Sequence, residues 1–129
     1  MPASLKPSND TTVVYIPTSS GQPRGERKAG SLEFTLKGQP LKLTAYVEAE
    51  SRTLDRLFVP FNDATNGTDT YQGGRYLDLD RTPTGLYEID FNRAYNPYCA
   101  YNSTYECPYP PPSNRLKVAV TAGEKVPGV

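Results

Sequence analysis

Prolines and glycines interrupt this chain so often that a long helix has little room to form. The 129 residues include 13 prolines and 10 glycines, and no stretch of ten or more residues shows a clean helical period without one of them. Proline breaks a helix because it lacks a backbone N–H and its ring clashes with the preceding turn, and glycine weakens a helix. The sequence therefore favours short strands joined by turns.

Seven short segments carry the apolar or alternating patterns that are typical of strands. They are residues 12–16, 32–36, 41–47, 56–61, 75–80, 86–91 and 116–121. This series predicts an all-β fold, either an antiparallel sandwich or a small barrel of about seven strands. We expect one domain over residues 1–129, with residues 1–11 as a flexible N-terminal tail and residues 18–30 as a loop.

The clearest pairing in the pattern joins residues 32–36 to residues 41–47 through the turn at residues 38–40. A second hairpin is predicted from residues 75–80 and 86–91, which flank a five-residue loop. In that register Asp78 lies opposite Glu88 on an outer face rich in carboxylates. Because like charges across a strand pair repel, this face either attracts a cation or is simply solvated.

An irregular strap is predicted over residues 90–112, which hold five of the ten tyrosines, several prolines and both cysteines. Cys99 and Cys107 are separated by seven residues. This spacing allows either a disulfide across the short loop or two separately buried thiols. With no histidine and no third cysteine a zinc site lacks ligands, so we expect no metal.

Charge and composition narrow the range of functions. Fourteen basic and fourteen acidic residues cancel, so the basic surface of a nucleic-acid binder is not expected. No stretch approaches the ~20 apolar residues of a membrane span, and the first residues lack the apolar segment of a secretory signal. We therefore predict no nucleic-acid or membrane partner and a cytoplasmic location.

The missing histidine removes the commonest catalytic base, and without a nucleotide-binding motif we expect no cofactor.

Four groups of residues form recognisable motifs. They are Asp63-x-Thr65-x-Gly67-x-x-Thr70-Tyr71-x-Gly73-Gly74-Arg75-Tyr76-Leu77, Asp90-Phe91-Asn92-Arg93-Ala94-Tyr95-Asn96-Pro97-x-Cys99-Ala100-Tyr101-Asn102, Cys107-Pro108-x-Pro110-Pro111-Pro112-x-Asn114-Arg115-Leu116 and Ala122-Gly123-Glu124-Lys125. Together they resemble the family called domain of unknown function 1684, from about residue 30 to residue 125, which looks like the C-terminal half of that family. The family has no established activity, so the resemblance implies no reaction.

The resemblance implies that one set of motif residues lies in one place. This set is Asp63, Thr65, Arg75, Asp90, Asn92, Tyr95, Asn96, Cys99, Cys107 and Asn114. It also implies that an N-terminal half is missing here, which would leave a surface through which the chain forms a homo-oligomer.

Three functions are compatible with these residues. In the first, a small molecule binds in a polar pocket made by Asp63, Thr65, Arg75, Asp90, Asn92, Tyr95 and Asn96. In the second, the same residues form a buried structural clasp. In the third, the protein is a hydrolase or lyase in which Asp63 or Asp90 is the general base. An open concavity lined by these side chains favours the first or third function, and a sealed, mutually paired arrangement favours the second.

Overall fold

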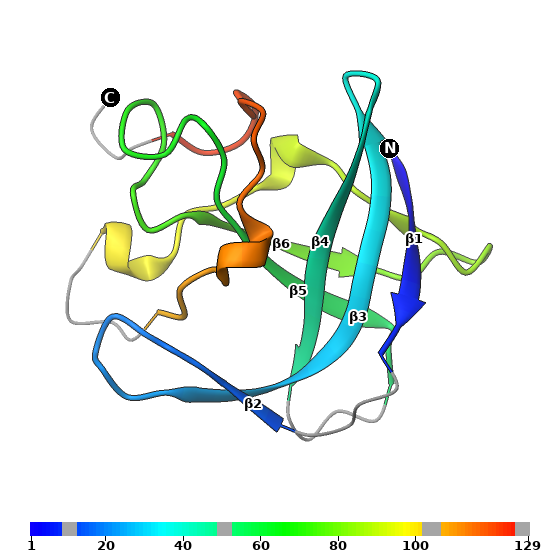
Figure 1. Ribbon diagram of the computed structural model, residues 1–129, viewed down its shortest axis with the longest axis horizontal. Helices are drawn as coiled ribbons and strands as arrows, with labels where there is room; N and C mark the ends of the chain where they lie inside the picture. The colour runs from blue at the N-terminus through cyan, green and yellow to red at the C-terminus, as the bar shows by residue number, and fades with distance from the viewer. Residues whose placement is uncertain (9–12, 49–52, 102–106, 126–129) are drawn as a thin grey trace.

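The computed structural model describes residues 1–8, 13–48, 53–101 and 107–125, and regular structure there is almost entirely β-strand. The strands are β1 (Pro2–Pro7), β2 (Val13–Ile16), β3 (Arg24–Leu36), β4 (Gln39–Glu48), β5 (Arg56–Phe61), β6 (Arg75–Asp80) and β7 (Tyr87–Glu88), shown in Figure 1. Three short 3₁₀ turns follow, η1 (Phe91–Arg93), η2 (Tyr98–Ala100) and η3 (Pro112–Asn114). The all-β prediction is confirmed. No helix in the described part of the chain is long and apolar enough to cross a membrane.

The seven strands form one antiparallel sheet that closes almost completely into a barrel. Its order is β6-β5-β4-β3-β1-β7, and β2 pairs with the first part of β3. Arg81, directly after β6, bridges Tyr87 in β7, which brings the two edges of the sheet together. Of the two predicted architectures, the structure is therefore the small barrel. Closure protects the sheet edges, which would otherwise expose unpaired backbone groups.

The long hairpin of β3 and β4 is the main element of the barrel, and it contains the predicted pairing of residues 32–36 with 41–47. A bulge between Lys28 and Gly30 interrupts its ladder. Because a bulge bends a strand, the first part of β3 pairs with β2 and its second part pairs with β1. Gly30 has a φ of 151°, and a Cβ at this position would overlap the Lys6 carbonyl oxygen in β1. Only glycine allows so close an approach of the two backbones.

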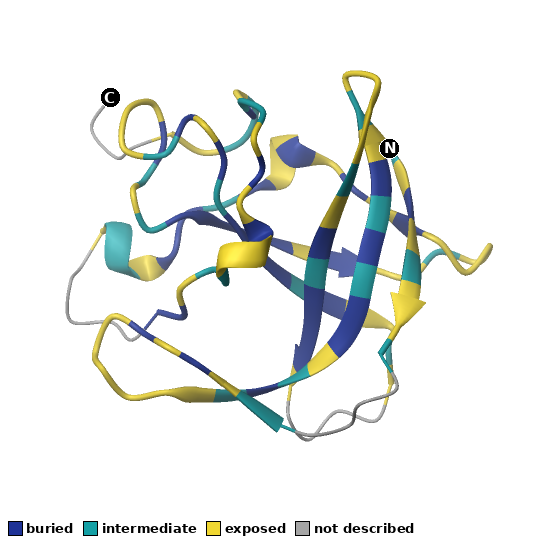
Figure 2. Ribbon diagram, in the orientation of Figure 1, coloured by how far each residue is buried: buried dark blue, intermediate teal, exposed yellow. Residues whose placement is uncertain are grey.

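The barrel interior is filled by alternate side chains of the strands, a pattern that Figure 2 shows along β3 and β4. Leu32, Leu43, Leu57 and Phe61 are completely buried, and the ring of Phe61 meets Phe91 edge-on with 5.5 Å between centroids. Burying each of these side chains contributes roughly 1.5–3 kcal/mol before entropy is counted. Because these side chains share one interior, the alternation of apolar and polar residues predicts these strands correctly.

Three predictions about the ends and edges of the sheet are wrong. Of the predicted flexible tail, residues 1–11, residues 2–7 form β1, in which the buried Ala3 pairs with Tyr87, and residues 9–11 lie outside the described part of the chain. Residues 24–30, predicted as part of a loop, belong to β3. Residues 116–121, predicted as the last strand, form no strand.

The predicted second hairpin is also different. β7 has only two residues and pairs with β1, so Asp78 does not lie opposite Glu88. Instead the backbone of Tyr95 pairs with Tyr76 in β6, with N–O distances of 2.9 and 3.0 Å. The outer face of β6, where Asp78 lies, is therefore next to the strap.

Replacing Gly30 by alanine tests the close approach of β1 and β3. Because the new Cβ would overlap a backbone carbonyl at an unfavourable φ, we expect Gly30→Ala to lower the free energy of unfolding by about 2–4 kcal/mol. Gly38→Ala is the matched control, since Gly38 also has a positive φ but nothing within 4 Å of its Cβ position, and it should cost only about 1 kcal/mol. Equal losses in urea denaturation would contradict the proposed contact.

Candidate functional site

The seven predicted ligand-binding residues do not share one pocket but fall into three places. Asp63, Thr65 and Arg75 form a buried clasp. Asp90 and Asn92 are exposed at η1, where the Asp90 carboxylate accepts a hydrogen bond of 3.0 Å from the Asn92 N–H. Tyr95 and Asn96 belong to the strap and line a cavity. Each place has a different physical role.

The clasp is centred on Arg75, whose side chain is 0% exposed. Its Nη2 lies 3.6 Å from Asp63 Oδ1 and donates to the Val120 carbonyl oxygen at 2.9 Å. Its Nη1 donates to the carbonyl oxygens of Ala122 and Glu124, and its guanidinium lies 5.3 Å from the centroid of the Phe61 ring. Burial lowers the pKa of Arg75, and the charge of Asp63 opposes this effect.

Asp63 receives donors from both sides. Thr65 Oγ1 donates at 2.9 Å to its carboxylate, and the Val120 N–H donates to Oδ2 at 2.5 Å. The Asp63 side chain is 0% exposed, and neither Asp63 nor Arg75 lines the cavities described below. Among the described residues Arg75 Nε has no hydrogen-bond partner, whereas both terminal nitrogens of Arg75 and both carboxylate oxygens of Asp63 have one. A charge pair enclosed in this way stabilises one arrangement of the segments it joins.

Asn114, another motif residue, connects two strands rather than binding in a pocket. Its Oδ1 accepts from the Thr44 N–H at 2.7 Å, and its Nδ2 donates to the carbonyl oxygens of Thr44 and Pro60 at 2.9 and 2.8 Å. β4 and β5 share only the pair Tyr46 and Phe58, and Pro60 has no N–H to donate. The amide of Asn114 therefore supplies the hydrogen bonds that the two strands cannot make directly.

The described parts of the strap, residues 90–101 and 107–112, are attached to the sheet by tyrosines. Tyr76 donates its hydroxyl to the Pro108 carbonyl oxygen at 2.6 Å, and Tyr95 donates its hydroxyl to Asp78 Oδ2 at 2.8 Å. Burial raises the pKa of both tyrosines, and the hydrogen bond to Asp78 raises that of Tyr95 further. Both hydroxyls are therefore protonated donors at neutral pH.

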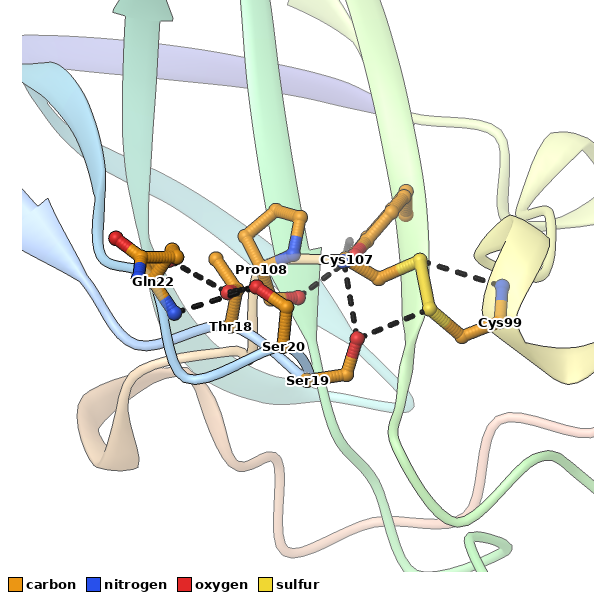
Figure 3. Close-up of a disulfide and its surroundings, with 8 residues drawn as sticks. Thr18, Ser19, Ser20, Gln22, Cys99, Cys107 and Pro108 are labelled. Atoms are coloured by element: carbon orange, nitrogen blue, oxygen red, sulfur yellow. Dashed lines mark hydrogen bonds between the residues drawn. A yellow bond between two sulfur atoms is a disulfide. The ribbon is translucent and has the colours of Figure 1, made fainter. Parts of the chain in front are cut away.

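Cys99 and Cys107 are joined by a disulfide, one of the two arrangements that the spacing allows. Figure 3 shows Ser19 beside it: the Ser19 hydroxyl lies 3.1 Å from Cys99 Sγ and accepts from the Cys107 N–H at 3.1 Å. The loop between β2 and β3 and the strap are thus held together. Disulfides persist most readily in oxidising compartments, and the cytoplasmic location stays a prediction.

A cavity of about 520 Å³ lies between the strap and the outer face of β3 to β6, and we call it the strap cavity. Its sheet side includes Glu26, Tyr46, Phe58, Tyr76 and Asp78, and its strap side includes Tyr95, Asn96, Tyr98 and Pro108. Lys28, Tyr46, Phe58 and Asp78 are partners in successive strands, so a single row of side chains crosses the sheet here. The strap covers much of this face, which sequence analysis predicted either to attract a cation or to be solvated.

Two ion pairs border the strap cavity. Arg24 Nε lies 2.8 Å from Glu26 Oε1, and the Arg24 guanidinium lies 5.8 Å from the centroid of the Phe58 ring. Arg56 Nη2 lies 3.8 Å from Asp78 Oδ2. The Glu26 side chain is only 2% exposed, and burial raises its pKa while Arg24 lowers it. Glu48, its partner across the ladder, raises the pKa of Glu26 further.

The main residues that sequence reasoning missed are those of the sheet side, above all Arg24, Glu26, Tyr46 and Arg56. Each is ordinary in sequence, since polar residues alternate with apolar ones along any such strand. Only the strand order brings them together around one cavity. Of the described residues, no three His, Cys, Asp or Glu side chains group closely enough to hold a metal ion.

The clasp can be tested by removing the charge of Asp63 while keeping its shape. We expect Asp63→Asn to lower the free energy of unfolding by about 3–5 kcal/mol, because Arg75 would be left buried without its counter-charge. Asp90→Asn makes the same chemical change at an exposed cap, which asparagine serves equally well, and should alter stability by less than about 0.5 kcal/mol. Urea denaturation of both variants measures the difference, and similar losses would contradict the distinction between clasp and cap.

Comparison with known proteins accounts for the motif set. The sequence matches the model of the family described as "Protein of unknown function (DUF1684)" over residues 1–125. The predicted restriction to the C-terminal half is therefore wrong, and the reason for expecting an exposed oligomerisation surface disappears with it. Among curated proteins none matches.

A solved structure is similar to this chain in both sequence and fold. The solution NMR structure of the uncharacterized protein from gene locus rrnAC0354 of Haloarcula marismortui is 38% identical, with a TM-score of 0.72. The match covers 96% of the present chain and 68% of that one. With β1 included in the match and residues 1–125 aligned to the family, the chain belongs to the DUF1684 family.

Proposed function

We propose that this domain binds a small molecule in the strap cavity. The observation that carries the proposal is the cavity itself, about 520 Å³ in volume and bordered by buried polar groups together with aromatic rings. Sites for small molecules commonly have volumes of roughly 300–1,000 Å³, with apolar walls and a few placed polar groups. Glu26 and Asn96 are such polar groups, and Tyr46, Phe58 and Tyr76 supply the ring surfaces.

Contacts within the protein hold several groups in the walls of the strap cavity, which favours binding because it reduces the ordering cost. Tyr95 is held by its backbone pairing with Tyr76 and by its hydroxyl bond to Asp78. Asn96 is held by Glu124 and Lys125, and the disulfide fixes the far end of the strap. A preformed, partly buried surface of this kind suits a binding domain.

This proposal divides the predicted site residues by role. Tyr95 and Asn96 would contact the ligand, Asp63, Thr65 and Arg75 would maintain the fold as a clasp, and Asp90 and Asn92 would cap η1. The hydrolase or lyase alternative relied on Asp63 or Asp90 as general base. Neither residue lines the strap cavity, so binding is favoured over that alternative.

A fragment survey monitored by two-dimensional NMR tests the proposal. With small aromatic acids, amines and amides as probes, we expect at least one probe to shift the resonances of cavity residues such as Tyr46, Asp78 and Asn96. Tyr95→Phe removes the hydroxyl that donates to Asp78 and should change the affinity for that probe several-fold, because the Asp78 carboxylate in the cavity wall loses its donor.

Tyr15→Phe is the matched control, because Tyr15 is 70% exposed and lies outside the strap cavity. It should leave the affinity unchanged. The proposal fails if no probe shifts cavity resonances, or if the shifts gather instead around η1 and the hollow beside Asp90 and Asn92.

A further inference from the structure

The strap cavity carries more negative than positive charge. Its border includes three carboxylates, from Glu26, Glu48 and Asp78, and two guanidinium groups, from Arg24 and Arg56. Arg24 pairs with Glu26 and Arg56 lies near Asp78. In the described part of the chain no basic side chain lies within ion-pair distance of Glu48. Counting only residues 1–8, 13–48, 53–101 and 107–125, one carboxylate at this border has no counter-charge.

The position of Glu48 makes this excess local rather than diffuse. Glu48 lies directly across the β3–β4 ladder from Glu26, which is buried. Like charges in directly opposite positions destabilise a strand pair, and a bound cation would relieve their repulsion. The place where positive charge is most favourable is thus the end of the cavity between β3 and β4.

Asn96 gives an independent indication of the same chemistry. Its side chain is buried, with 3% exposure, and Nδ2 donates to the Lys125 carbonyl oxygen at 2.9 Å and to the Tyr101 hydroxyl at 3.2 Å. Because a carbonyl can only accept, this contact fixes which end of the amide is Nδ2. Oδ1 then faces no donor among the described residues. Asn96 lines the strap cavity, and its Oδ1 is enclosed there without a partner. Because an unpaired buried acceptor costs free energy, a ligand donor that approached Oδ1 would be favoured.

The aromatic walls are suited to a flat cation. The Arg24 guanidinium already lies over the Phe58 ring, an arrangement in which a delocalised cation is attracted by the ring face. Tyr46 and Tyr76 add two further buried rings to the same border. Ring faces, surplus carboxylate and a free acceptor all favour a molecule with a positively charged nitrogen.

We propose that the ligand of the strap cavity is a small molecule with a flat or apolar body and a cationic N–H donor group of the amidinium or ammonium type. This inference rests on the proposed function, since it assigns the chemical class bound at the same site. The cationic group lies toward Glu26 and Glu48, the body lies against Phe58 and Tyr46, and an N–H is directed toward the Asn96 side of the cavity.

Three probes of nearly equal shape separate charge from size. Benzamidine is a cation at neutral pH, benzamide is neutral and benzoate is an anion. In isothermal titration of the wild-type protein we expect benzamidine to bind at least about tenfold more tightly than benzamide, because charge-assisted hydrogen bonds are the stronger ones. Benzoate should show no binding, since the surplus carboxylate repels it.

Variants locate the cation. Glu48→Gln changes an exposed side chain and should weaken benzamidine several-fold without affecting the fold. Glu26→Gln should weaken it as well, and its folding can be checked by the same NMR spectrum. Glu33→Gln is the matched control, because Glu33 lies on β3 like Glu26 but pairs with Lys42 at the surface. This variant should leave the affinity for benzamidine unchanged.

The outcomes distinguish this inference from the proposed function. Equal binding of benzamidine and benzamide, tighter binding of benzoate, or equal effects of Glu48→Gln and Glu33→Gln would each overturn the assignment of a cationic ligand. If benzamidine fails while neutral or acidic fragments shift the cavity resonances, the ligand class is wrong and the binding function stands. If no fragment of any charge shifts them, both proposals fail.

Discussion

The buried ion pair of Arg75 and Asp63 is the interaction on which the rest of the structure depends. It holds the backbone of residues 120–124 through the carbonyl oxygens of Val120, Ala122 and Glu124 and through the Val120 N–H. The segment held in this way in turn holds the strap, since Glu124 Oε1 accepts from the Asn96 N–H at 3.0 Å. The strap finally forms one wall of the strap cavity. The Arg75–Asp63 ion pair thus positions a wall of the strap cavity, although neither residue lines that cavity.

The sequence predicted the fold class and the main strands because one face of those strands is packed against the barrel interior. It failed for residues 116–121, although Leu116, Val118 and Val120 alternate there as in a strand. The backbone groups of Leu116 and Val118 bond to Asn62 and Ala64, which lie just beyond the end of β5. Val120 instead donates its N–H to Asp63 and accepts from Arg75, so no adjacent strand completes a ladder. A period of two records which side chains are buried, and it carries no information on what pairs with the backbone.

The candidate site was less predictable than the fold, for a physical reason. Asp63, Arg75 and Asn114 were selected as motif residues, yet their side chains satisfy buried backbone groups and do not line the strap cavity. Tyr95 and Asn96 were selected together with them and do line it. The remaining polar groups, Glu26 among them, come together only through strand order and through the bulge at Gly30. Such neighbours, distant in sequence, leave no local pattern.

The most direct test of this account is native-state hydrogen exchange of the Val120 and Asn96 amides. Val120 reports on the clasp and Asn96 on the strap that the clasp supports. If the ion pair, the C-terminal segment and the strap form one unit with the barrel, both amides should exchange with the same free energy as the slowest amides of the β3–β4 hairpin. Exchange of Asn96 through a local opening of much lower free energy, while the hairpin stays protected, would contradict the account.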